Sequence, residues 1–321
     1  MANAVIHGTP VASNTLEYLI QSNDRNLATF IASDLLQRAP FLRAAYAQNA
    51  SNGTQHKFEV ETDEPGVAFR NVNEGRENAA GKSKIVTVDL KIVDASFERD
   101  QAVADGYVEG AVMYMEREGV KALRAAFALA NRQLVRGTGE VATGFYGLAD
   151  YIDQFAQDMQ ILKTTAAGSS VYMGRFGEDA VSVISRESGL ISDGVIFPTV
   201  INTTAGKQLS TYSFPLISWL GLQVAGHYNL ARLANVPQTG EGTLTDEMLM
   251  DLLGLFPSDY RPDFILMSRA DVVNLAKSRT ATTPTGATAP VPTTWDNAGY
   301  PMQIIVDDSV VNQAATTTTG E

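Results

Sequence analysis

Aspartate, glutamate and histidine side chains could do acid–base chemistry in this chain, but their spacing matches no catalytic arrangement. The 321 residues include three histidines, His7, His56 and His227, and no cysteine. None of the histidines accompanies a serine nucleophile elbow or an HExxH pattern, which hydrolases and zinc enzymes use. Without cysteine there is no disulfide, no thiol nucleophile and no thiolate zinc ligand. We therefore predict no catalytic residue, no cofactor and no metal site.

Two carboxylate pairs and one glycine-rich stretch are the remaining candidates for a binding site. Asp150 with Asp153, and Asp307 with Asp308, carry groups that bind cations or act as acid and base, but their spacing is not that of a calcium loop. We interpret them as solvated surface acids. The stretch 137–144, GTGEVATG, has the glycines of a nucleotide-binding loop, but it follows a helical pattern, whereas such a loop follows a strand and opens a helix. We interpret it as a helix stop and turn.

The composition indicates a folded, acidic protein. Hydrophobic residues make up 45% of the chain and charged residues 19%, enough to bury a large core. The sequence shows no secretory signal and no run of about 18 apolar residues, so we expect synthesis in a cytoplasm and no membrane span. The net charge of −12 argues against broad affinity for nucleic acid. It is compatible with the inner wall of a DNA container, and equally with ordinary solubility.

A long hairpin is the most distinctive element that the sequence predicts. Phe58 and Val60 alternate with glutamates, and Val86 and Val88 alternate with polar residues, which indicates two strands with one apolar face each. The stretch 63–83 between them is too long for a tight turn and too poor in apolar residues to form a core. Because such a ribbon is not stable alone, we expect it to lie on a neighbouring subunit. A mobile surface loop is the alternative.

A long helix is predicted directly after the hairpin, from Ala104 to Val135. Apolar residues recur there on one face, and at 1.5 Å per residue the helix is about 48 Å long, so it needs a sheet or a partner along much of its length. Gly119 predicts a bend or a close contact, and Gly137 ends the helix. A set of five charged residues is interpreted as a solvated face: Glu116, Glu118, Lys121, Arg124 and Arg132.

The rest of the chain predicts an α+β fold without internal repeats. Helices are expected at 26–38, 151–162, 243–255 and 270–277, strands at 170–176, 179–184, 264–267 and 302–306, one or two strands within 220–236, and an exposed loop at 280–294.

Taken in order, these stretches resemble the major capsid proteins of tailed bacteriophages, the family with the Hong Kong 97 phage-type capsid fold. FEVETDEPGVAFRNVNEG followed by KIVTVDLKIVDASFERD looks like the extended E-loop and its return strand. LANRQLVRGTG and GFYGLADY look like the end of the spine helix and the turn after it. GLQVAGHYNLARLANV, RPDFILMSRADVVNLAKSR and GYPMQIIVDDSVV resemble the central A-domain and the closing strand.

The resemblance implies a division of the chain and a function. The implied parts are an N-terminal arm at 1–50, an E-loop at 51–98, a P-domain with the spine helix at 99–145, an A-domain at 146–298, and a closing strand with a C-terminal tail at 299–321. The stretch 165–215 fits least well and is a candidate insertion. The implied function is that of a major capsid protein, assembled in the host cytoplasm as pentamers and hexamers into an icosahedral head around double-stranded DNA. The short arm implies a separate scaffolding protein, and a portal and decoration proteins are further expected partners.

Within the E-loop, five residues are predicted to touch a neighbouring subunit through one aromatic anchor and opposed charges. They are Phe69, Arg70, Glu74, Arg76 and Glu77. Some relatives crosslink a lysine to an asparagine between subunits, which we do not predict here because no residue specifies the acid that this reaction needs. Two other functions stay open: an encapsulin-like shell around a protein cargo, and a soluble hydrolase or nucleotide-binding enzyme.

Overall fold

The computed structural model describes residues 39–63, 65–67, 69–75, 80–164, 168–186, 195–202, 206–282, 289–296 and 301–311. The chain divides into two compact units. Unit 1 contains Met1–Arg38, Val93–Phe127 and Ile191–Ser218, and unit 2 contains Ala39–Ile92, Ala128–Leu190 and Trp219–Glu321. The helix expected at 26–38 lies outside the described residues.

Unit 1 packs helices against a small antiparallel sheet. The strands β5 (Phe97–Asp100), β10 (Gln208–Phe214) and β9 (Phe197–Asn202) form this sheet in the order β5-β10-β9. The helix α3 (Gln101–Asp105) and the first part of α4 (Ala111–Arg136) belong to the same unit. Its core is built from aromatic and aliphatic side chains of both layers, among them Phe97, Tyr107, Tyr114, Met115 and Phe214.

The long helix begins later than predicted, and its middle makes the close contact that Gly119 indicates. The chain leaves α3 at Gly106, and Gly110 has a φ of 92°, a left-handed conformation that favours glycine and interrupts a helix. The helix α4 therefore starts at Ala111 and not at Ala104. A Cβ atom on Gly119 would lie 2.6 Å from Cε1 of Phe214, so only glycine lets the helix approach β10 this closely.

One charged residue of α4 does not lie on a solvated face as predicted. Glu118 is 3% exposed and forms ion pairs with Arg99 at 3.1 Å and Lys121 at 2.5 Å. Because a buried carboxylate is costly without such partners, this network ties α4 to β5 within unit 1.

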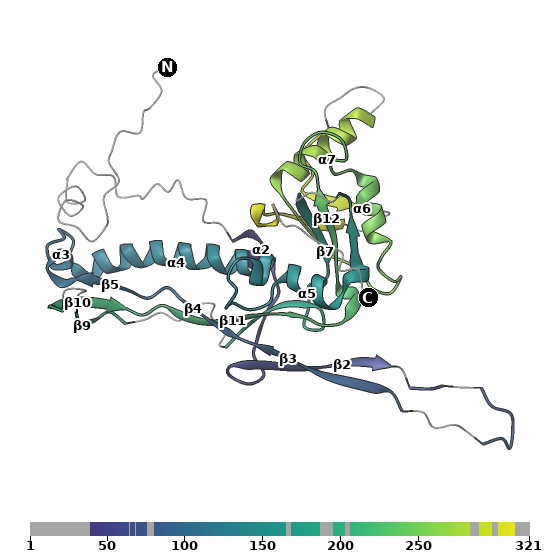
Figure 1. Ribbon diagram of the computed structural model, residues 1–321, viewed down its shortest axis with the longest axis horizontal. Helices are drawn as coiled ribbons and strands as arrows, with labels where there is room; N and C mark the ends of the chain where they lie inside the picture. The colour runs from purple at the N-terminus through teal and green to yellow at the C-terminus, as the bar shows by residue number, and fades with distance from the viewer. Residues whose placement is uncertain are drawn as a thin grey trace. The chain divides into compact units, whose positions relative to one another are not determined.

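Unit 2 is centred on a six-stranded mixed sheet with the order β14-β15-β13-β7-β12-β6. β13–β15 and β12–β6 are parallel, and the other neighbours are antiparallel. In chain order its strands are β6 (Gln160–Leu162), β7 (Ser169–Gly174), β12 (Leu230–Val236), β13 (Phe264–Met267), β14 (Thr294–Asp296) and β15 (Pro301–Val306). Every residue of β7, β12 and β13 is buried, so these strands form the centre of the core. The helices α6 (Asp246–Leu253) and α7 (Arg269–Thr282) lie beside this sheet (Figure 1).

Two further sheets are formed by the described residues, and one of them is the hairpin itself. A four-stranded sheet has the order β1-β8-β11-β4, and β2 and β3 form a two-stranded ribbon. The strands are β1 (Ala47–Asn49), β2 (Gln55–Asp63), β3 (Lys82–Asp89), β4 (Lys91–Asp94), β8 (Val181–Ser185) and β11 (Ile217–Val224). The short helix α2 (Pro40–Ala44) precedes β1, and α5 (Leu148–Phe155) follows the turn after α4.

The strands expected at 170–176, 179–184, 264–267 and 302–306 and the helices expected at 243–255 and 270–277 are confirmed. The bounds of 264–267 are as predicted, and the ends of the others are shifted. The helix expected at 151–162 is wrong in its second half, because α5 ends at Phe155 and β6 follows. The loop expected at 280–294 begins inside α7, which runs to Thr282, and Thr294 already belongs to β14.

Candidate functional site

The predicted hairpin is present as the β2–β3 ribbon, here called the ribbon (Gln55–Asp89). Its register runs from Gln55 opposite Asp89 to Asp63 opposite Lys82 and places Phe58 directly opposite Val86. Side chains of opposite residues share one face of a two-stranded sheet, so the apolar face predicted from the alternation is confirmed. At the far end of the ladder Lys82 pairs with Asp63 at 3.1 Å, and since both side chains are exposed this ion pair contributes little stability.

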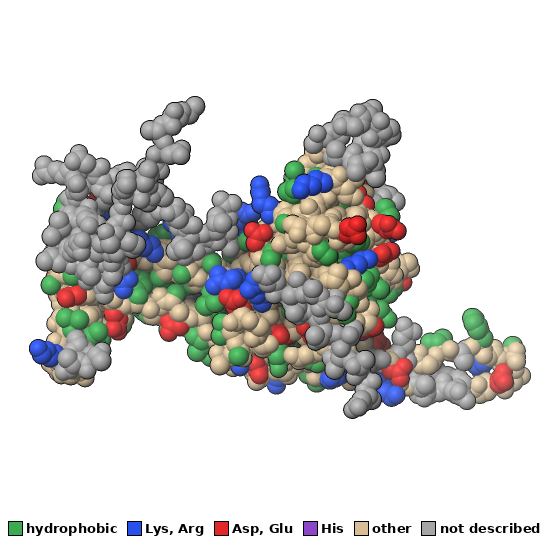
Figure 2. All heavy atoms as spheres, turned by 45° about the horizontal axis from the view of Figure 1, so that its top comes forward, with side chains coloured by type: hydrophobic (Ala, Val, Ile, Leu, Met, Phe, Trp, Pro, Cys, Tyr) green, Lys and Arg blue, Asp and Glu red, His purple; other side chains and the backbone are tan. Residues whose placement is uncertain are grey.

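The loop beyond the ladder carries three exposed hydrophobic side chains, Val67, Phe69 and Val72, here called the tip. All three are almost fully or fully exposed. Figure 2 shows hydrophobic side chains at the outer end of the ribbon, set apart from the rest of unit 2. An apolar cluster held in solvent on a thin projection indicates a surface that another molecule covers.

The polar residues of the loop hold its backbone in a turn. An Nη1 group of Arg70 donates to the carbonyl oxygen of Glu74 at 2.7 Å, and Oε2 of Glu74 accepts from the amide of Asn71 at 2.9 Å. Asn73 has a φ of 64°, which asparagine tolerates better than most residues. Of the five predicted contact residues, Phe69, Arg70 and Glu74 thus lie together on one exposed turn, while Arg76 and Glu77 lie outside the described residues.

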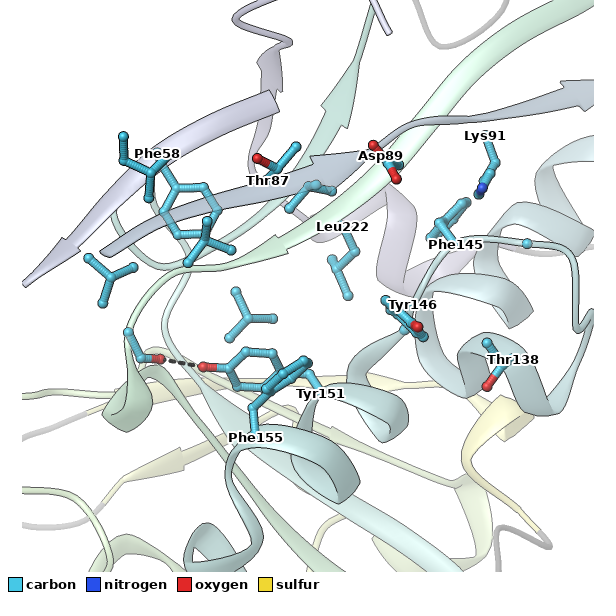
Figure 3. Close-up of a pocket in the computed structure, with 18 of the residues that line it drawn as sticks. Phe58, Thr87, Asp89, Lys91, Thr138, Phe145, Tyr146, Tyr151, Phe155 and Leu222 are labelled. Atoms are coloured by element: carbon cyan, nitrogen blue, oxygen red, sulfur yellow. Dashed lines mark hydrogen bonds between the residues drawn. The ribbon is translucent and has the colours of Figure 1, made fainter. Parts of the chain in front are cut away.

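A groove of about 720 Å³ lies at the base of the ribbon (Figure 3). The apolar face of the ribbon forms one wall, the segment after α4 together with α5 forms the opposite wall, and β11 contributes the floor. Its apolar and aromatic lining includes Phe58, Val60, Ile85, Val86, Val88, Phe145, Tyr146, Tyr151, Phe155, Leu222 and Val224. Its charged lining residues are Lys84, Asp89 and Lys91, and His227 also lines it. The groove therefore suits an apolar ligand with polar groups at its edge.

A rigid turn fixes the wall opposite the ribbon. The carboxylate of Asp150 accepts from the amide of Thr138 at 2.7 Å, from Oγ1 of Thr138 at 2.6 Å and from the amide of Gly147 at 3.0 Å. Gly137 has a φ of 59° and lies so close that a Cβ atom there would collide with this carboxylate. The glycine-rich stretch is thus a helix stop and turn, as predicted, and Asp150 organises it from a half-buried position.

Two hydrogen bonds from α5 and the residues after it hold the end of the groove. The Tyr151 hydroxyl donates to the carbonyl oxygen of Gly226 at 2.8 Å, and burial raises the pKa of Tyr151 to about 12. His227 Nε2 lies 2.7 Å from Oδ2 of Asp158, and this hydrogen bond lowers the pKa of Asp158. The first contact joins α5, and the second joins the segment after α5, to the β11–β12 connection.

The other predicted surface acids have structural partners, and one of them is buried. Asp153 lies 3.2 Å from the buried guanidinium of Arg232; burial raises the pKa of Asp153, and Arg232 opposes this effect. Asp307 is 5% exposed and accepts from Nδ2 of Asn131 at 2.6 Å and from Oγ of Ser309 at 2.6 Å. The interpretation of Asp307 as a solvated acid is therefore wrong, because its carboxylate caps the turn after β15 and anchors α4. Asp308 is exposed as predicted.

The described part of the chain offers no group of three or more histidine, aspartate or glutamate side chains that would hold a metal ion. Among the helices that the structure describes, none is long and apolar enough to cross a membrane.

Comparison with known proteins gives one family and a consistent fold. The family model of the major capsid protein GP7 matches residues 23–255. A chain of the bacteriophage Epsilon15 structure superposes with a TM-score of 0.64 at 14% identity and covers 98% of this chain and 99% of its own length. The bacteriophage JBD30 capsid gives a TM-score of 0.54 at 13% identity, covering 87% of this chain and 93% of that chain. The JBD30 capsid decorated with minor capsid protein trimers gives 0.53 at 12% identity, covering 92% and 99%. The comparison with curated protein sequences gives no match.

Proposed function

This chain belongs to the GP7 family of major capsid proteins, and we propose that it assembles as pentamers and hexamers into an icosahedral head around double-stranded DNA. It is a structural subunit of a capsid shell. The observation that carries this function is the family match over residues 23–255, and the fold shared with the Epsilon15 chain over almost the whole length agrees with it. The role is architectural and not enzymatic, and assembly takes place in the host cytoplasm.

We assign the ribbon and its loop, within residues 51–98, to the E-loop that lies on a neighbouring subunit. The support is the exposed tip, with Phe69 as the apolar anchor and Arg70 and Glu74 as polar neighbours. An exposed aromatic with charged neighbours is typical of the residues that dominate protein interfaces.

We assign the remaining segments of the chain to the domains that the family resemblance implies. Residues 1–50 form the N-terminal arm, 99–145 the P-domain with the spine helix α4, 146–298 the A-domain, and 299–321 the closing strand and tail. Because Ile191–Ser218 clusters with Val93–Phe127 in unit 1, the strands β9 and β10 are added to the P-domain. This is the stretch that fits the family pattern least well.

A separate scaffolding protein, a portal and decoration proteins complete the proposed head. The structurally similar JBD30 capsid carries minor capsid protein trimers, which supports a decoration protein for this shell as well.

The proposed function is tested by the mass of the purified assembly and by its content. Light scattering and negative-stain micrographs are expected to give closed particles of megadalton mass, whereas an enzyme of this size is expected to form a monomer or a small oligomer. Nuclease treatment and nucleic-acid staining separate a genome container from an encapsulin-like shell with protein cargo. A chain that stays monomeric at all concentrations, also when it is produced together with its scaffolding protein, would contradict the capsid function.

The role of the ribbon is tested by shortening it without disturbing its base. Replacement of residues 64–81 by Asn-Gly leaves Asp63 opposite Lys82 and supplies the two-residue turn that suits a hairpin. We expect a soluble subunit with an unchanged melting temperature that does not close shells. Normal particles from this variant would refute the assignment.

A further inference from the structure

We propose that the tip of one subunit's ribbon docks into the groove at the base of the next subunit's ribbon, so that each subunit gives one tip and receives one. This inference rests on the proposed function, because it names the partner site for the ribbon within a ring of identical chains. Its two halves, the apolar tip and the open apolar groove, both belong to unit 2 of this chain.

The tip is held away from its own groove. The groove lies beside Phe58 and Val60, and the ladder continues past them to Asp63 opposite Lys82. Beyond the ladder the strands stay adjacent, since a Cβ atom on Gly81 would lie 2.9 Å from the carbonyl oxygen of Asp63 and 3.2 Å from the ring of Pro65. From Val60 to Phe69 the extended chain covers about 30 Å, and Figure 1 shows the ribbon running outward from its base. A tip that fills such a groove therefore comes from a second copy.

The charges of the two surfaces are opposite. The sequence from Asp63 to Lys82 contains four acidic and three basic side chains, a net charge of −1. The charged side chains of the groove, with histidine taken as neutral, are Lys84, Lys91 and Asp89, a net charge of +1. These opposite signs favour the pairing of a tip with a groove.

The area of the contact explains why it needs a ring. The phenylalanine buries at most about 250 Å², and with the two valines the tip alone stays well below the roughly 1,200 Å² of a stable interface. A head-to-tail contact that closes into a ring repeats once per subunit. In the closed ring these weak contacts act together, so the ring is more stable than a single contact between two subunits. The free subunit is accordingly expected to stay monomeric when dilute.

Disulfide trapping tests the pairing directly, because the chain contains no cysteine. Subunits with Phe69→Cys are mixed in equal amounts with subunits carrying Phe155→Cys, assembled, and oxidised under mild conditions. A covalent dimer that a reductant removes is expected in the mixture. The doubly substituted chain is expected to give a ladder of covalent oligomers that ends at the size of the ring.

A matched control uses Val291→Cys in place of Phe155→Cys, since the two native side chains are 60% and 61% exposed. The control pair is expected to stay monomeric in a denaturing gel. If Phe155→Cys lowers the melting temperature, Tyr146→Cys on the same wall replaces it.

Three results would overturn the inference. Closed particles whose Phe69→Cys and Phe155→Cys subunits link no more than the control pair show that the tip docks elsewhere, and the capsid function then stands. A link from Phe155→Cys to Phe30→Cys in place of Phe69→Cys assigns the groove to the N-terminal arm. Equal linking by both pairs shows random collision. If the unsubstituted chain forms no particles even together with its scaffolding protein, the proposed function itself fails.

Discussion

Replacing Phe69 with alanine separates the energy of folding from the energy of assembly. The Phe69 side chain is fully exposed in the single subunit, so its removal takes no packing away from the core. We expect the free energy of unfolding of the Phe69→Ala subunit to change by less than about 0.5 kcal/mol, which is the range of surface substitutions.

Assembly is expected to respond much more strongly. Burying a phenylalanine side chain in a partner's pocket contributes about 2 kcal/mol. Since each subunit gives one tip, this loss occurs once per subunit whatever the size of the ring. At 1.4 kcal/mol per factor of ten, the concentration needed for assembly is expected to rise about 30-fold.

Two measurements on the same preparation check this prediction. Thermal denaturation of dilute subunit reports folding, and light scattering across a concentration series reports the threshold of assembly. Phe69→Leu is the matched control, because it keeps an apolar side chain and is expected to raise the threshold only a few-fold. The reasoning is refuted by a large drop in melting temperature, which would mean that Phe69 packs within its own subunit, or by an unchanged threshold.

Three further predictions concern the fold of the subunit. Gly119→Val is expected to destabilise the subunit by about 2 kcal/mol in denaturant unfolding, because the new side chain overlaps the ring of Phe214; unchanged stability would mean that α4 does not approach β10 this closely. Asp150→Ala is expected to cost about 3 kcal/mol because three donors lose their acceptor, and Asp150→Asn is expected to recover part of this in the same assay. The hydrogen bond from Arg279 lowers the pKa of Asp246, so the stabilisation by this carboxylate is present above the ordinary carboxyl pKa and is lost as the pH falls through the lowered value. The difference in unfolding free energy between the native chain and Asp246→Asn is therefore expected to be about 2 kcal/mol at pH 7 and to shrink below about pH 4, and a difference that grows at low pH would contradict this sign.

Elements whose burial is visible in a short stretch of sequence are predictable here. Phe264–Met267 is an uninterrupted apolar run, and it forms the fully buried strand β13 with the predicted bounds. The alternation in the ribbon likewise predicts which side chains share a face, because the period of a strand is two. In both cases the local pattern already contains the decisive information.

Elements that depend on distant partners are not predictable in the same way. The sheet of β5, β10 and β9 joins segments about a hundred positions apart and presents polar and apolar side chains to solvent, so no periodic apolar run marks its strands. The helix expected at 151–162 fails for a related reason. The apolar spacing continues past Phe155, but the backbone at Ala156 leaves the helical region with a φ of −141°, and Gln160–Leu162 pairs in parallel with β12.

The candidate site likewise has one part that could be predicted from the sequence and one part that could not. The exposure of Val67 and Val72 at the tip was not foreseen, but the long loop itself was predictable, because its length and its low apolar content are visible in the sequence. The groove was not, because it joins the ribbon to residues after α4 and at the end of β11, which only the tertiary structure brings together. Asp307 and Asp308 look alike in sequence, and only the turn after β15 decides that the first is buried and the second exposed.

Burial of the side chains along the ribbon decreases steadily from its base to the tip. The base therefore anchors the ribbon within the subunit, and the tip is available to contact another subunit. Leu90, next to the base, is buried against β11, Phe58 and Val86 are half-buried at the groove, and Phe69 is fully exposed at the end. The base is therefore anchored within the subunit, whereas the tip has no apolar cover of its own among the described residues. Since a two-stranded ribbon gains little stability from its own backbone pairing, the anchored base allows the tip to stand in solvent without unfolding the subunit. Assembly can then cover the tip without refolding the rest of unit 2. Because the base of the ribbon is already ordered in the monomer, the subunit contact loses conformational entropy only at the tip.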